Sequence, residues 1–212
     1  MKRPAPKTLH RYTNLAATIH MLRSRTITLL NPGTWDDRND AYFMAEYKRL
    51  QKLTTLLALC FADVEETYHH WRVFSYGTDG ARIEFDRDRL LAAVANDRRV
   101  TARAVQYRKI RELNDDVALN LDHLPFLKRD PFRHENEFRI IYADRRVTSA
   151  SRDVAIDIGC IRRITLSPWM ARPLATSVIA SLKEIDGCES LKIYRSTLID
   201  NEKWQSLASN AR

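Results

Sequence analysis

Charged side chains are densest in the stretch 128–140, and a strand is predicted over 137–143. Alternate residues of a strand share one face, so Glu135, Glu137 and Arg139 are expected to point the same way. A carboxylate in such a group can orient a sugar hydroxyl, stabilise a developing cation or act as a general base. The alternative interpretation is an edge strand that carries a surface salt bridge.

A second candidate is the sequence LHRYT at 9–13, near the start of the chain. A basic residue ends the expected strand 8–12. Thr13 and Asn14 are both N-cap residue types, and the hydroxyl of Thr13 is expected to cap the following helix. Helix N-termini bind anions, so a phosphate could lie there, although an ordinary capped turn has the same pattern. His10 and Arg11 are adjacent, so only one of them can face a given cleft, and the sequence leaves both open.

Trp71, Ser75 and Tyr76 form a third candidate, because they precede the glycine-rich turn at 77–80. Two aromatic side chains ahead of a turn could provide a stacking wall for a planar ring. Aromatic residues more often fill the core, and that interpretation stays open for this segment.

The chain lacks several motifs that would identify other chemistries. It contains neither a G-x-G-x-x-G nor a G-x-x-x-x-G-K-[ST] pattern, which disfavours a Rossmann or P-loop nucleotide site. His69 and His70 are neighbours, and on a helix they would point about 100° apart, so one metal ion would rarely bind both. Asp36 and Asp37 could bind a metal ion, but clustered acids in a loop more often cap and turn the chain. No metal is therefore expected.

The composition indicates a globular protein of 212 residues with a net charge of +8. The positive charge is spread along the chain, which is typical of a solvated cationic surface or of a protein that binds polyanions. The three cysteines have no C-x-x-C spacing, which supports neither a zinc knuckle nor a thioredoxin-like pair. A reducing cytoplasm is the expected compartment. No signal peptide and no run of 18 apolar residues is present, so no membrane association is expected.

The pattern of breaks and apolar runs predicts an α+β fold with a small mixed or antiparallel sheet flanked by helices. A single domain is expected over 8–200, with short tails at 1–7 and 201–212. The expected strands are 8–12, 26–30, 55–62, 81–85, 100–107, 137–143, 154–158, 161–166 and 191–194. The expected helices are one after Asn14 and others over 41–52, 65–73, 87–96, 111–121 and 173–185.

The order of these segments resembles a bacterial family known only as a domain of unknown function. Two departures stand out: Trp35-Asp36-Asp37 replaces an NDP-like loop, and Ala62 replaces a serine. The resemblance covers most of the chain and is carried by LHRYTNLAATIHMLRSRTITLLNPGTWDDRNDAYF, LLALCFADVEETYHHWRVFSYGTDGARIEF, LKRDPFRHENEFRIIY and IRRITLSP.

The same order resembles the ADP-ribosyltransferase fold. Such enzymes carry an arginine or histidine at the end of the first strand, a hydroxyl residue in the middle and a late glutamate. Arg11 or His10 matches the first position, Ser75 or Tyr76 the second, and Glu137 the third. The segment Glu135-Asn136-Glu137 is similar to the Glu-x-Glu turn of transferases that modify arginine.

The resemblance implies a transferase that uses NAD as substrate. Glu137 would stabilise the oxocarbenium-like ribose, and Glu135 would orient the acceptor. Arg11 would neutralise the diphosphate, and Tyr76 or Trp71 would stack on nicotinamide. The implied acceptor is a protein or a nucleic acid, in the context of a toxin or phage-defence effector with an antitoxin as a further partner.

Two other functions remain open from the sequence. Clustered acids on a basic chain suggest a metal-dependent nuclease that uses Asp36, Asp37, Glu135 and Glu137. The net charge alone suggests a module that binds nucleic acid or a partner protein without catalysis.

Overall fold

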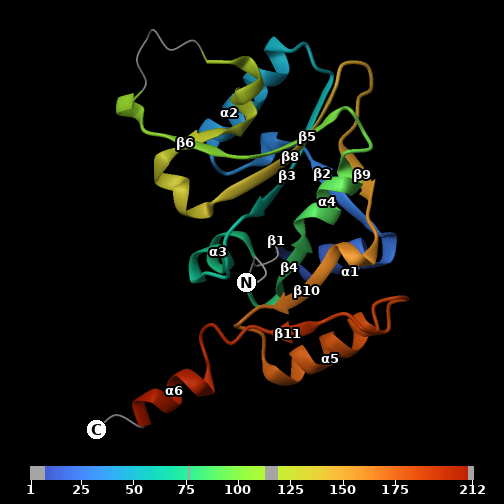
Figure 1. Cartoon of the computed structure of the whole chain (residues 1–212), viewed down its shortest axis with the longest axis vertical. Helices are drawn as coiled ribbons and strands as arrows, with labels where there is room; N and C mark the ends of the chain where they lie inside the picture. The colour runs from blue at the N-terminus through green and yellow to red at the C-terminus, as the bar shows by residue number, and fades with distance from the viewer. Residues whose placement is uncertain (1–7, 76, 113–118, 210–212) are drawn as a thin grey trace, which may run out of the picture.

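The computed structural model describes residues 8–75, 77–112 and 119–209 (Figure 1). Its strands are β1 (Thr8–Asn14), β2 (Thr26–Leu30), β3 (Thr55–Ala62), β4 (Gly80–Asp86), β5 (Val100–Ala104), β6 (Gln106–Arg108), β7 (Leu127–Arg129), β8 (Glu137–Asp144), β9 (Ser151–Ala155), β10 (Ile161–Leu166) and β11 (Ile193–Arg195). Its α-helices are α1 (Leu15–Ser24), α2 (Arg38–Leu50), α3 (Tyr68–Phe74), α4 (Arg87–Val94), α5 (Arg172–Lys183) and α6 (Glu202–Ser209). Its 3-10 segments are η1 (Pro32–Thr34), η2 (Gly77–Asp79), η3 (Ile110–Glu112), η4 (Leu121–Phe126), η5 (Asp130–Glu135) and η6 (Ile158–Cys160).

Within this part of the chain, nine strands form one largely antiparallel sheet. Its main path runs β11-β10-β4-β1-β3-β2-β9, and β8 pairs with β3 and carries β5 on its other edge. Only the pair β10–β11 of this sheet is parallel among the described strands. The α+β class and the antiparallel, helix-flanked sheet are confirmed, whereas the prediction that the sheet is small was wrong.

The two faces of the sheet are covered by different helices. Residues of β3 alternate: Leu57, Leu59 and Phe61 join the main core with α1 and α4, while Leu56 and Ala58 pack with α2. On the second face, the end of β3 and β1 form a smaller cluster with α3. The second face, which α2 and α3 cover, holds the odd-numbered residues at the start of β8.

Three strands were predicted with their observed bounds, namely 26–30, 55–62 and 161–166. Each is a compact apolar or β-branched segment with a clear break at its end, such as Pro32 or Pro168. Other bounds differ by a few residues, because caps decide where a helix begins. Asp37 caps α2 and Thr67 caps α3, so α2 starts before 41 and α3 starts after 65.

The expected strand 100–107 is two strands in the structure. β5 pairs with β8, and the backbone N–H of Val105 donates to the carbonyl of Glu137 at 2.9 Å, where this pairing ends. The chain then leaves the sheet, and β6 pairs in parallel with β7. The expected helix 111–121 contains 3-10 turns at its two edges, and its centre lies outside the described residues.

The expected strand 154–158 begins and ends earlier, as β9, because Asp157 caps the η6 turn with a bond to the N–H of Gly159. The C-terminal segment expected as a tail contains α6, which extends away from the sheet (Figure 1). The expected tail 1–7 lies outside the described residues. No helix in the described ranges combines the length and the apolar character needed to cross a membrane.

Candidate functional site

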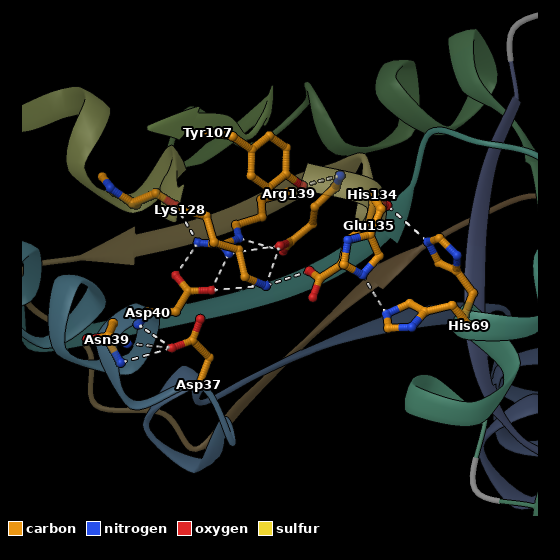
Figure 2. A network of polar contacts seen from close by, with 12 residues as sticks. Asp37, Asn39, Asp40, His69, Tyr107, Lys128, His134, Glu135 and Arg139 are labelled. Carbon is orange, nitrogen blue, oxygen red and sulfur yellow. Dashed lines mark hydrogen bonds and ion pairs between the residues drawn. The ribbon is translucent and has the colours of Figure 1, made fainter. Parts of the chain in front are cut away.

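Three carboxylates and two cations meet on the face of the sheet that α2 covers (Figure 2). Lys128 lies at the centre, with its Nζ 2.6 Å from Glu135, 3.2 Å from Glu137 and 3.6 Å from Asp40. The guanidinium of Arg139 donates to both oxygens of Glu137, at 2.6 and 2.9 Å, and also binds both oxygens of Asp40. The five side chains carry a formal charge of −1 when all are ionised. We call this group the acidic cluster.

The local backbone explains why the two glutamates converge. Glu137 opens β8, and strand alternation places Arg139 beside it. Glu135 ends η5 and is not part of the strand, and Asn136 between them has φ 43°, in the left-handed region. This turn brings Glu135 back toward Lys128. Glu135 and Glu137 therefore point to the same cation, as a result of the turn at Asn136 and not of the strand alternation that the sequence predicted.

Asp40 enters the cluster from the first turn of α2. Asp37 caps this helix by accepting from the N–H groups of Asn39 and Asp40, at 3.0 and 3.4 Å (Figure 2). The cap therefore fixes the backbone that carries Asp40. Sequence reasoning assigned Asp40 and Lys128 no role. A usable signal was the four-residue spacing of Asp40 and Met44, which placed an acid on the buried stripe of an amphipathic helix.

The environment separates the pKa values of the two glutamates. Burial would raise the pKa of Glu137, but Arg139 and Lys128 outweigh it and lower the pKa to about 2. Burial raises the pKa of Glu135, and Lys128 only partly offsets this effect. At neutral pH Glu137 is therefore a fixed negative charge, and Glu135 is the stronger base of the two.

Aromatic rings border the acidic cluster on several sides. Lys128 lies 5.0 Å from the ring centroid of Phe132, and the guanidinium of Arg139 lies 4.7 Å from that of Trp35. The hydroxyl of Tyr107 accepts from the backbone N–H of Glu137 at 2.9 Å. Sequence reasoning gave these three rings no role in the site. Trp35 and Tyr107 lie far from the two glutamates along the chain, whereas Phe132 lies on η5 within the stretch 128–140.

Of the two basic residues of β1, His10 shares the face of Glu137. In register, His10 is opposite Ala62 on β3, and Ala62 is opposite Glu137 on β8. Arg11 lies on the opposite face, in register with Ile83, and its Nη1 donates to the carbonyl of Cys60 at 2.9 Å. The structure thus places His10, and not Arg11, on the face that holds Glu137, while the predicted role of either residue toward a ligand stays a prediction.

The other predicted ligand-binding residues have different surroundings. Trp71 is fully buried, and its Nε1 donates to Glu66 at 2.6 Å. Ser75 is also buried, and its hydroxyl donates to the carbonyl of Trp71. Both positions match the core interpretation, and their predicted roles toward a ligand stay untested. Tyr76 lies outside the described residues.

The helix cap at the first βα turn is Asn14 and not Thr13. The side chain of Asn14 accepts from the N–H of Ala17 at 2.8 Å, so this group is not open to a phosphate. Thr13 is instead a half-buried residue of β1. The prediction that the hydroxyl of Thr13 caps this helix was wrong, because the strand continues two residues further than expected, to Asn14.

The acids proposed for a nuclease do not form one group. Asp36 is exposed, Asp37 caps α2, and the two glutamates are in ion pairs with Lys128. In the described ranges, no set of three or more histidine, cysteine or acidic side chains is arranged to hold a metal ion.

Histidines join α3 to the segment that carries Glu135. The Nε2 of buried His70 donates to the carbonyl of Glu135 at 3.0 Å, and its Nδ1 accepts from the hydroxyl of Thr67. The Nε2 atoms of His69 and His134 are 2.9 Å apart (Figure 2). These contacts fix the position of η5 relative to α3.

No family model matches this sequence, and no curated protein matches it. Solved structures that are similar to this chain include three of one protein. They are structures of Thermus sp. 2.9 DarT. The complex with NAD+ has a TM-score of 0.48 and 9% identity over 92% of this chain and 98% of that one. The complex with ADP-ribosylated ssDNA has a TM-score of 0.48 and 11% identity over the same shares. The complex with carba-NAD+ has a TM-score of 0.46 and 10% identity, over 92% and 97%.

Proposed function

We propose that this chain transfers ADP-ribose from NAD+ to a macromolecular acceptor. The observation that carries the proposal is the pair Glu135 and Glu137, which share Lys128 but have pKa values shifted in opposite directions. Two carboxyls with separated pKa values suit a reaction that needs both a fixed charge and a proton acceptor.

The chemistry assigns one task to each glutamate. As the bond between ribose C1′ and nicotinamide breaks, nicotinamide leaves with the electron pair and positive charge develops on the ribose. Ionised Glu137 stabilises that charge, and Arg139 holds its carboxylate in place. The acceptor atom then forms a bond to C1′, and its proton passes to Glu135.

His10 is the β1 residue that we propose for the substrate side of the site. It is 2% exposed and lies in the same sheet row as Glu137. The aromatic border of Trp35, Phe132 and Tyr107 offers flat surfaces for a nicotinamide or adenine ring.

The proposal also covers the chemical class of the acceptor and the biological role. The net charge of +8 favours a polyanionic acceptor, so single-stranded DNA and RNA should be tested beside protein. A toxin or phage-defence role, with an antitoxin that binds the chain, is consistent with consumption of NAD+.

The test is nicotinamide release from NAD+, with and without cell extract, by wild type and Glu137→Gln. We expect the variant to lose activity on the order of 100-fold or more, because a neutral amide cannot stabilise the ribose cation. The exposed Glu189→Gln is the matched control and should keep wild-type release. Circular dichroism should confirm that the Glu137 variant is folded.

Full NAD+ turnover by folded Glu137→Gln would contradict the proposal. So would the absence of both NAD+ binding and nicotinamide release by the wild type in every extract. The second result would favour a module that binds nucleic acid or a partner without catalysis.

A further inference from the structure

Three buried polar groups lie together on β1 and β4, beside the acidic cluster but separate from it. Tyr12 on β1 and Arg82 on β4 are directly opposite each other. His10 precedes Tyr12 by two residues on β1, so both side chains lie on the same face of the sheet. Arg82 and His10 are each 2% exposed, and Tyr12 is 6% exposed. In the described part of the chain, the Nε of Arg82, the hydroxyl of Tyr12 and the Nδ1 of His10 lack a hydrogen-bond partner.

These groups offer donors to an anion. Arg82 supplies a permanent positive charge, and burial raises the pKa of Tyr12 to about 12, so its hydroxyl keeps its proton. The Nε2 of His10 lies 3.2 Å from the hydroxyl of Thr8, and when it accepts from Thr8 the Nδ1 carries the ring proton. Buried polar donors and a buried guanidinium are costly unless they are paired, so this arrangement suits a negatively charged ligand.

The carboxylate that faces Arg82 belongs to an exposed residue. Glu65 lies 3.5 Å from the Nη2 of Arg82, and its own side chain is 84% exposed. Glu84, which is in register with His10 and has an oxygen 4.0 Å from the Nε2 of His10, is bound to Arg163 at 2.5 Å. Glu66 accepts from Trp71 and from a serine hydroxyl. Glu65 is therefore a weakly held partner that an external anion could replace.

Glu65 belongs to the segment 63–67, which joins β3 to α3. This segment lies over the three groups together with α3, whose His70 and Trp71 rings pack on Tyr12. The backbone of Val64 lies near the ring of His10 and that of Thr67 lies near the hydroxyl of Tyr12, close enough to shift both pKa values but without a hydrogen bond of normal geometry. A ligand that reaches Arg82 must displace Glu65, and with it part of this segment.

We propose that Arg82, with Tyr12 and His10, binds the diphosphate of a dinucleotide, and that Glu65 competes with the diphosphate for Arg82. The choice of NAD+ as the dinucleotide rests on the proposed function. Arg82 on β4 thereby takes the role that the resemblance gave to Arg11, which lies on the other face of the sheet. Arg82 on β4 and Glu137 on β8 lie on strands that are three positions apart in the sheet, a separation of about 14 Å.

The test measures the binding of inorganic pyrophosphate and of NAD+ by calorimetry. Glu65→Gln should bind pyrophosphate roughly two- to fivefold more tightly than wild type, because the competing carboxylate is removed. Asp79→Asn is the matched control: it removes the same charge from an exposed position and should keep wild-type affinity. Arg82→Met should bind pyrophosphate at least tenfold more weakly.

Equal pyrophosphate affinity of wild type and Glu65→Gln would overturn the inference, as would the absence of pyrophosphate binding by both. This comparison decides the matter even if Arg82→Met does not fold, because Glu65 is exposed. If pyrophosphate binding behaves as expected but no nicotinamide is released, the anion site stands and the proposed transferase fails. If nicotinamide is released but Glu65→Gln has no effect on binding, the transferase stands and the anion site fails.

Discussion

At the residue scale, the candidate site depends on how a few buried charges share partners. Lys128 is bound by three carboxylates, and Arg139 is bound by two of the same three. Neither cation can be removed without leaving carboxylates underpaired in a buried place. The same ion pairs that set the two pKa values of the glutamates therefore also contribute to folding.

Lys128→Met is expected to lower the free energy of unfolding by about 3–5 kcal/mol, because it leaves buried carboxylates without their shared cation. The exposed Lys52→Met should change it by about 0.5 kcal/mol or less. Urea unfolding followed by circular dichroism measures both. A cost below about 1 kcal/mol for Lys128→Met would mean that the cluster contributes little to stability.

His70 should make stability depend on pH. Burial lowers its pKa below 6.5, so the folded chain binds fewer protons than the unfolded chain just below that pH. Its contribution to the free energy of unfolding is present above pH 6.5 and is lost as the pH falls toward the pKa of the folded state.

Consequently, His70→Gln should lose less stability than wild type between pH 7 and pH 5. Asp40 and Glu135 have raised pKa values, so their contributions to the free energy of unfolding change with pH in the opposite direction to that of His70. Both proteins contain these two acids, so their contributions cancel when the two pH profiles are compared. His20→Gln, at an exposed position, serves as the control and should follow wild type. Identical pH dependence of His70→Gln and wild type, in thermal unfolding, would contradict the assignment.

At the scale of elements, α2 and β8 position most of the acidic cluster. β8 supplies Glu137 and Arg139, and the first turn of α2 supplies Asp40. The helix start is fixed by Asp37, so a surface cap determines where a buried carboxylate lies. Loss of the cap should therefore affect both the helix and the cluster.

Asp37→Ala should lower the free energy of unfolding by about 1 kcal/mol, the usual effect of losing an N-cap. Asp36→Ala is the matched control, because Asp36 is the exposed neighbouring acid and makes no such cap. Chemical denaturation of the two variants measures the difference. Equal stabilities would show that Asp37 does not determine the start of α2.

At the scale of the whole molecule, one sheet carries the main core from β1 to β11. Buried residues of α1, α4, α5 and most strands belong to the same cluster. A continuous core of this kind predicts cooperative unfolding and a single domain over 8–200.

Unfolding in urea should therefore give coincident transitions by far-UV circular dichroism and by tryptophan fluorescence. Trp71 reports on the core, whereas Trp204 on α6 is 72% exposed and gives a poor signal of folding. The variant Trp204→Phe removes that signal and should keep the wild-type midpoint. Two separated transitions in this variant would divide the chain into more than one domain.

The sequence by itself determined the local features of this protein. Short-range patterns decided the strands 26–30, 55–62 and 161–166 and the α+β class, because these depend on residues close along the chain. Tertiary structure alone decided the rest. Register across β1, β3 and β8 places His10, and not Arg11, on the face of Glu137, and long-range packing brings Asp40 to Arg139 and Arg82 to Tyr12. No local pattern encodes these contacts, because they join segments that meet only when the sheet is assembled.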